Sequence, residues 1–195
     1  MPPLLNDLFI SKVRVKLLQV FLSHPDELYY VRQLVRMTNE EINAVRRELA
    51  HMEGAEMVKK EFRGNRLYYW FRKDYLFYDD LLRMIIKTAG LGKEIIKQRN
   101  KLGRLNYVLF SGRFARHLNR EHQEDIDILL IGDIVLPEVT ALIQTEEARR
   151  KQEINYTVMN EQEFKTRKSG RDPFLANILS QSRVMIIGEE EKLLE

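Results

Sequence analysis

The chain has 195 residues, of which 44% are hydrophobic and 31% are charged, and its formal net charge is +3. This composition predicts a soluble protein with a packed core, in one or two domains. No apolar run approaches the roughly 18 residues that a membrane-spanning helix needs. Met1 leads into two prolines instead of a signal peptide, so we expect a cytoplasmic protein without a membrane partner. The absence of cysteine excludes disulfides, thiolate metal sites and thiol nucleophiles.

The positive charge is concentrated in the first half of the chain. Residues 1–100 contain 18 Lys and Arg against 13 Asp and Glu, whereas residues 101–195 contain 14 against 16. We therefore expect the two halves to meet different partners.

Three helical patterns open the chain. Apolar residues recur at helical spacing over 10–22, and a shorter pattern covers 30–37. Thr38 or Asn39 is expected to cap a third helix, with Glu40 and Glu41 in its first turn and an end near Gly54. The apolar side of this third helix comprises Ile42, Val45, Leu49 and Met52.

A hairpin follows the third helix. Two strand-like runs within residues 57–71 flank Gly64 and Asn65, which both tolerate the positive φ of a tight turn. Three helices followed by a β-hairpin is the order of a winged helix-turn-helix. We therefore predict such a domain over residues 1–73.

The rest of the chain predicts a linker and a second domain. Residues 74–102 are expected to be helical, with a joint near Gly90 and Gly92 and an apolar face over 76–86 that favours a homodimer. Beyond 103, strands are predicted at 105–110, 126–131, 154–158 and 183–187, the last at the sheet edge. Helices are predicted at 113–120, 136–148, 161–168 and 173–180. Residues 103–195 thus predict a small α/β domain with a mixed sheet, and the whole chain an α+β fold of two domains.

Polar residues of the third helix and of the hairpin predict an interface with double-stranded DNA. Asn and Arg offer the donors that read base edges and phosphates in the major groove. Basic residues around a hairpin tip suit the DNA backbone or the minor groove. The alternative is that the arginines are ordinary solvated residues of a helix. The predicted DNA-binding residues are Asn39, Asn43, Arg46, Arg47, Lys59, Lys60, Arg63 and Arg66.

The segment over residues 29–71 resembles winged-helix regulators of the ArsR type. The phrases YYVRQL, EEINAVRREL and GNRLYY carry this resemblance. It implies a transcriptional regulator in which the helix after the turn, carrying Asn39, Asn43, Arg46 and Arg47, lies in the major groove. Metal sensing through thiolates is excluded, because the chain has no cysteine.

Two acids in the second half predict a cation site. Asp125 and Asp127 are two residues apart on a predicted strand, so their side chains are expected to share a face. Mg²⁺ prefers oxygen ligands and commonly binds together with phosphates. Glu153, on the next predicted strand, is the candidate for a third acid. The alternative is that Asp125 and Asp127 are a solvated pair at the start of a strand, neutralised by Arg116 or Arg120. Upstream, Ser111 and Gly112 open a predicted helix, whose free amides attract phosphate.

This half resembles the minimal nucleotidyltransferases of the DNA polymerase beta superfamily. Gly112, Ala115, Arg116, Asp125, Ile126 and Asp127 match its G-S, A-R-G and D-I-D signature. The resemblance implies Mg²⁺ and NTP as ligands, with Asp125, Asp127 and Glu153 catalytic and metal-binding. It places nucleotide contacts at Ser111, Gly112, Arg113 and Arg116.

Three residues depart from the signature. Arg113 replaces the serine, His117 replaces the glycine after A-R, and Glu153 stands where an Asp is expected. A bulky Arg113 crowds the phosphate loop, and catalysis is more sensitive to such a displacement than binding is. We therefore expect a degenerate domain that senses a nucleotide or a protein partner. The alternatives are an active transferase that moves NMP from NTP to a hydroxyl group, and an antitoxin-like protein that binds another protein.

Overall fold

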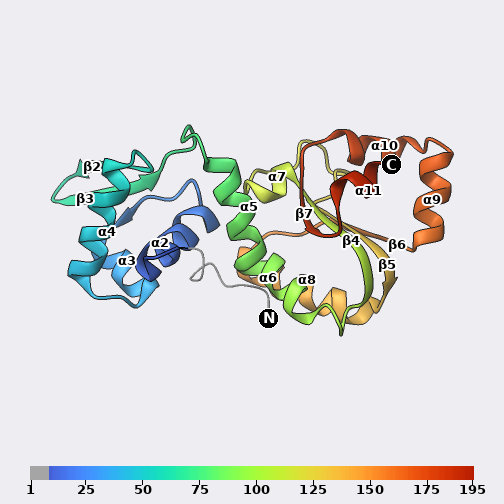
Figure 1. The fold of residues 1–195 in the computed structure, drawn as a ribbon, viewed down its shortest axis with the longest axis horizontal. Coiled ribbons are helices and arrows are strands. Elements are labelled where there is room, and N and C mark those ends of the chain that lie inside the picture. Colours follow the sequence, from blue (N-terminus) through green and yellow to red (C-terminus); the bar gives the residue numbers. More distant parts are fainter. Residues whose placement is uncertain (1–8) are drawn as a thin grey trace. The chain divides into compact units, whose positions relative to one another are not determined.

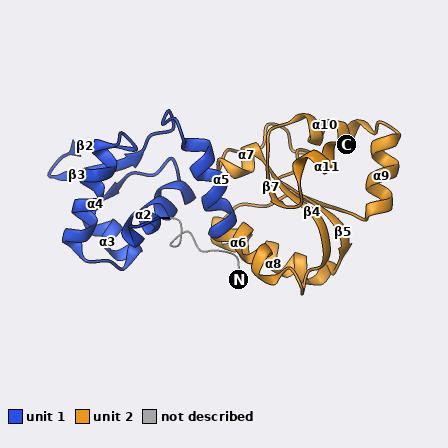
Figure 2. Ribbon diagram, viewed as in Figure 1, with its two compact units in different colours: residues 1–88 blue, residues 89–195 orange. Residues whose placement is uncertain are grey.

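The computed structural model describes residues 9–195; the expectation about the chain's first residues falls on 1–8, which lie outside them. Two compact units divide the chain between Thr88 and Ala89 (Figure 2), inside the segment predicted as a linker. Both units combine helices with a sheet, so the fold is α+β. None of the helices within 9–195 is long and apolar enough to cross a bilayer.

Unit 1 places three helices before a β-hairpin (Figure 1). Its elements are α2 (Lys12–Ser23), β1 (Tyr29–Tyr30), α3 (Val31–Thr38), α4 (Ile42–Gly54), β2 (Val58–Arg63), β3 (Arg66–Phe71) and α5 (Tyr78–Thr88). The sheet order is β1-β3-β2, with antiparallel pairing throughout. Gly64 begins the two-residue turn with φ of 60°, which glycine adopts without steric cost.

The core of unit 1 forms around α2. Leu17, Leu18 and Phe21 are almost fully buried on one side of this helix, as their helical spacing predicts. The Phe21 ring packs edge-on against Tyr29 at 5.7 Å between centroids and lies 6.5 Å from Phe71. These contacts join α2 to two strands, so the helices and the sheet of unit 1 share one core.

Helix α4 begins later than the sequence pattern predicts. Glu41 is its N-cap: the carboxylate accepts hydrogen bonds from the amides of Asn43 at 2.7 Å and Ala44 at 3.0 Å. Neither predicted capping residue has that role. The Thr38 hydroxyl is buried and donates to the Leu34 carbonyl at 2.7 Å, and Asn39 ends α3 with φ of 52°.

Unit 2 has a four-stranded mixed sheet in the order β6-β5-β4-β7. β4 pairs antiparallel with β5 and β7, and β5 pairs parallel with β6. β7 therefore lies at an edge, as predicted. The elements are α6 (Gly90–Gln98), β4 (Gly103–Ser111), α7 (Gly112–Ala115), β5 (Ile128–Ile134), α8 (Leu136–Arg150), β6 (Tyr156–Met159), α9 (Glu161–Ser169), α10 (Pro173–Ser180), β7 (Arg183–Ile187) and α11 (Glu190–Leu194).

Helices cover both faces of this sheet (Figure 1). Leu129 and Ile131 of β5 lie in a cluster with Phe164 of α9, Leu175 of α10 and Leu193 of α11. α6 and α8 contact each other and lie on the other side of the sheet. A strand that is buried on both faces is apolar throughout, which explains the run of Leu and Ile in β5.

Further details differ from the sequence pattern. The helix predicted over 113–120 has only four residues, because His117 adopts φ of 58°, outside the helical region. β5 begins at Ile128 instead of Ile126, so Asp125 and Asp127 precede the strand. The pattern also missed α11 and the two-residue β1, which pairs with β3.

Candidate functional site

Helix α4 presents a polar face to solvent. Val45 and Leu49 are fully buried against unit 1, whereas Asn43, Arg46 and Arg47 are exposed on the outer side of the helix. Within residues 9–195, neither arginine forms an ion pair with a carboxylate. Asn39, predicted for the same face, is exposed but ends α3 instead of belonging to α4.

The four predicted hairpin residues differ in how their charges are engaged. Lys60 binds the carboxylate of Glu53 on α4 at 2.7 Å, and Arg63 binds Glu61 on its own strand. Lys59 and Arg63 border an open hollow beside Trp70. Arg66 lies elsewhere, with its guanidinium 4.9 Å from the ring centre of Tyr30.

A second hollow, of about 760 Å³, lies where α3, α4 and the hairpin tip meet. Four arginines line it: Arg32 and Arg36 from α3, Arg46 from α4, and Arg66 from β3. We call it the arginine hollow. Arg32 and Arg36 were not predicted as site residues, although their spacing of four places both on one helix face. That spacing was the available signal, but the sequence could not show that their face adjoins Arg46.

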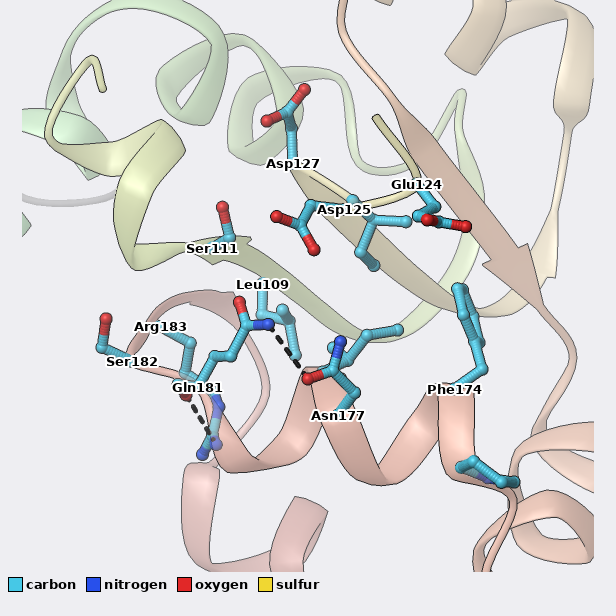
Figure 3. A pocket seen from close by; sticks show the side chains of 13 residues that line it. Leu109, Ser111, Glu124, Asp125, Asp127, Phe174, Asn177, Gln181, Ser182 and Arg183 are labelled. Atoms are coloured by element: carbon cyan, nitrogen blue, oxygen red, sulfur yellow. Dashed lines mark hydrogen bonds between the residues drawn. The ribbon is translucent and has the colours of Figure 1, made fainter. Parts of the chain in front are cut away.

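Unit 2 contains a pocket of about 300 Å³ beside the predicted acids (Figure 3). Ser111, Asp125 and Asp127 line one side of it, so the fold brings together three of the residues that the resemblance implied. Gly112, Arg113, Arg116 and Glu153 do not line it. Helix α10 forms the other side with Phe174 and Asn177, and Gln181 follows that helix. These α10 residues carry no chemical motif, and only the packing of the helix places them there.

Asp127 is buried, with 5% of its surface exposed. Its carboxylate accepts a hydrogen bond from the Asn155 amide at 2.9 Å and lies 3.9 Å from the Arg120 guanidinium. Burial nevertheless dominates and raises the pKa of Asp127, and the neighbouring Asp125 charge acts in the same direction. Burial of the ionised Asp127 carboxylate therefore costs free energy, and the Asn155 amide and Arg120 offset part of that cost.

Asp125 and Asp127 do not point the same way. Figure 3 shows the Asp125 carboxylate on the side of the pocket nearer α10 and the Asp127 carboxylate turned away from that helix. The Asp125 carboxylate accepts hydrogen bonds from the amides of His122 at 2.9 Å and Glu121 at 3.2 Å, so it closes a turn. The expected alternation on one strand face does not apply, because both residues precede β5.

The third predicted acid does not complete a metal site. The Glu153 side chain is 83% exposed, and the Arg120 guanidinium lies 3.9 Å from it and 3.9 Å from Asp127. A cation of the chain itself thus lies beside both carboxylates. Across residues 9–195, no group of three or more His, Asp or Glu residues is placed to hold a metal ion. The residues do not fit Mg²⁺ as arranged.

The predicted phosphate loop is also engaged internally. The Gly112 amide donates to the Ser182 carbonyl at 2.7 Å, and the Ser111 hydroxyl accepts from the Phe114 amide at 3.2 Å. Added side-chain bulk at Gly112 would collide with Ser182, which accounts for the glycine. Helix α7 has only four residues, too few for an appreciable dipole at its N-terminus.

Arg113 and its neighbours stabilise the loop after α7. Arg113 donates to the Asn119 carbonyl at 2.9 Å and lies 3.4 Å from the Glu121 carboxylate. His117, at the position where the resemblance expects glycine, adopts φ of 58°, a conformation that glycine enters freely. Its ring nitrogen lies 3.5 Å from Arg150. These contacts are structural and do not place Arg113 in the pocket.

The two units thus offer different surfaces: cationic residues on unit 1, and in unit 2 a pocket lined by three acidic residues, Glu124, Asp125 and Asp127. Comparison with protein-family models, with curated proteins and with solved structures gives no match to this chain.

Proposed function

We propose that this protein is a sequence-specific DNA-binding transcriptional regulator, with unit 1 as a winged helix-turn-helix domain. In this proposal α4 lies in the major groove and the β2–β3 hairpin contacts the adjacent backbone. Dimerisation would pair two such helices on two half-sites, as is usual for this type of domain. The resemblance of residues 29–71 to ArsR-type regulators supports the same function.

The observation that carries the proposal is that the polar face of α4 is exposed to solvent. Asn43, Arg46 and Arg47 are exposed, and within the described residues no carboxylate neutralises either arginine. Asn can pair with adenine and Arg with guanine through two hydrogen bonds each. On the opposite side of α4, Val45 and Leu49 are fully buried in the core of unit 1. Because this packing fixes the helix, its polar groups keep a fixed direction.

Selection from a library of random-sequence duplexes tests this proposal. The wild-type chain is expected to enrich a defined motif, and Arg46→Ala or Arg47→Ala is expected to lose about 1–3 kcal/mol of discrimination at one position of it. Arg83→Ala is the matched control, because Arg83 is an exposed arginine of the same unit on α5. If neither α4 variant changes the enriched motif, the assignment of α4 as the reading helix is wrong.

For unit 2 we propose a sensing module with a nucleotidyltransferase-like fold. The pocket that contains Ser111, Asp125 and Asp127 supports a site for a small ligand, and 300 Å³ is at the lower end of ligand pockets. The positions of Glu153, Arg113 and the α7 amides favour binding over turnover. A protein partner is the other ligand consistent with this proposal.

A further inference from the structure

The arginine hollow brings cationic groups from three separate elements together. Arg32 and Arg36 come from α3, Arg46 from α4 and Arg66 from β3, and all four side chains are exposed. Among the residues that the structure describes, 9–195, no acidic residue lines the hollow. Like charges gathered in this way repel one another, so the arrangement costs free energy unless an anion is bound.

Elsewhere in the chain, arginines commonly have acidic partners. Arg72 binds Asp74 at 2.9 Å, and Arg167 binds Glu163 at 2.8 Å. Arg149 and Arg150 share the buried carboxylate of Glu146, whose pKa is lowered by their hydrogen bonds despite burial. Within residues 9–195, by contrast, the four arginines of the hollow form no ion pair. Their positive charge is left for a ligand.

Tyr30 holds two of these arginines in place. Its hydroxyl accepts a hydrogen bond from Arg36 at 2.9 Å, and its ring faces the Arg66 guanidinium at 4.9 Å. The ring is itself fixed, because Tyr30 pairs with Tyr68 in the β1–β3 ladder and the two rings pack edge-on at 5.8 Å. One tyrosine therefore orients guanidinium groups from a helix and from a strand, and lowers the entropy that they lose on binding.

We propose that Arg32, together with Arg36 and Arg66, which Tyr30 orients, forms a clamp for the phosphodiester backbone of duplex DNA. This inference rests on the function proposed above and assigns the backbone contact to residues outside α4. Arg46 belongs both to the exposed face of α4 and to the hollow. In a helix-turn-helix, the first helix, here α3, crosses the DNA backbone. A duplex with α4 in its major groove would therefore bring the phosphates of one strand to the hollow. Guanidinium groups bind phosphate through two parallel hydrogen bonds.

The test measures binding of the full chain to a short random-sequence duplex by fluorescence anisotropy at several salt concentrations. Phosphate contacts are independent of sequence, so no operator is needed. Arg36→Gln and Arg66→Gln are each expected to reduce the slope of log K against log salt by about one. That change corresponds to a loss of affinity of about tenfold at roughly 0.1 M salt. Arg32→Gln is expected to act in the same direction.

Arg83→Gln is the matched control, because it removes the same charge from unit 1 outside the hollow. It is expected to leave both the affinity and the slope unchanged. Thermal unfolding of each variant checks that the fold is retained. If the three hollow variants match Arg83→Gln while Arg46→Ala still weakens binding, the clamp is overturned and the DNA-binding function stands. If the wild-type chain binds no duplex even at low salt, both proposals fail.

Variants of Tyr30 test its positioning role. Tyr30→Phe keeps the ring under Arg66 but removes the hydrogen bond to Arg36, and is expected to weaken binding about threefold. Tyr30→Leu removes both contacts and is expected to weaken binding about as much as Arg36→Gln. Equal binding by Tyr30→Leu and the wild-type chain would refute the role of Tyr30.

Competition with inorganic phosphate shows whether the hollow binds the DNA backbone or a small anion. At matched ionic strength, phosphate and chloride buffers are expected to give the same affinity for the duplex, because a backbone clamp binds a row of phosphates and a single small anion competes poorly. Selective displacement of the duplex by millimolar phosphate would assign the hollow to a small anion and would overturn the backbone clamp.

Discussion

The carboxylate of Asp127 accepts one backbone hydrogen bond and has one guanidinium 3.9 Å away, yet burial raises its pKa. The sequence identified the residue and offered Arg120 as one neutralising partner, but it did not predict the burial of the carboxylate. A D-x-D pair on an exposed strand would be stabilised by a cation, whereas the buried Asp127 carboxylate is only partly compensated, by a backbone amide and Arg120. The chemistry of Asp127 is therefore set by its neighbours on other elements.

Substitution of Asp127 separates its charge from its hydrogen bond. Asp127→Asn retains an acceptor for the Asn155 amide and removes the buried charge, so we expect a free energy of unfolding at pH 7 equal to or above that of the wild-type chain. Asp127→Ala leaves the amide unpaired and is expected to cost about 1–3 kcal/mol. Denaturant unfolding measures both changes. The exposed Glu153→Gln is the control and should change little.

The difference in stability between Asp127→Asn and the wild-type chain depends on pH with a defined sign. The folded pKa of Asp127 is raised, so its ionised form weakens the fold. That cost is absent below the unfolded pKa of about 3.9, develops as the pH rises through the folded pKa, and is constant above it. The stability of Asp127→Asn relative to the wild-type chain is therefore expected to increase with pH over this window. A relative stability that decreases with pH would contradict the burial argument.

At the scale of elements, periodicity located most helices correctly, and tertiary contacts decided their ends. The patterns of α8, α9 and α10 predicted helices that end within two residues of the observed ones, and the start of each was predicted correctly. α7 was predicted too long, because the apolar pattern does not show that His117 takes a positive φ. The start of α4 was misplaced, since Thr38 satisfies its hydroxyl within α3.

Substitution of Glu41 tests whether this residue caps α4. Glu41→Ala removes the acceptor for two backbone amides and is expected to lower the free energy of unfolding by about 0.5–1 kcal/mol. Glu27→Ala, an exposed glutamate outside any helix, is the control and should have a smaller effect. Chemical denaturation of both variants decides the question. Equal stabilities would show that solvent caps α4 as well as Glu41 does.

At the scale of the whole molecule, two compact units carry the two proposed functions. The excess of positive charge lies before residue 100, and the arginine hollow and α4 belong to unit 1. The pocket with Asp125 and Asp127 belongs to unit 2. If unit 2 is a sensor, its ligand must bind the DNA-competent and the DNA-incompetent states of the chain with different affinities.

Thermodynamic linkage turns this requirement into a measurement. If ATP or GTP is the ligand, it should change the DNA affinity of the full chain by the same factor by which DNA changes the nucleotide affinity. Couplings of this kind are typically about 5- to 150-fold. Asp125→Asn should change the size of the effect, because Asp125 lines the pocket. Nucleotide binding without any change in DNA affinity would refute a sensing role. Transfer of label from NTP to an acceptor would instead support the transferase alternative.

The sequence by itself determined the α+β class, the order of the elements apart from β1 and α11, the hairpin turn at Gly64 and the edge position of β7. These depend on periodicity, on turn chemistry and on which strands are apolar throughout, all of which are local properties. Only the tertiary structure decided which charges remain unpaired. Arg32, Arg36, Arg46 and Arg66 meet because α3, α4 and the hairpin pack together, whereas Glu153 is separated from Asp127 by a chain cation. The pairing of a charge depends on neighbours that are distant in sequence, and no local pattern encodes them.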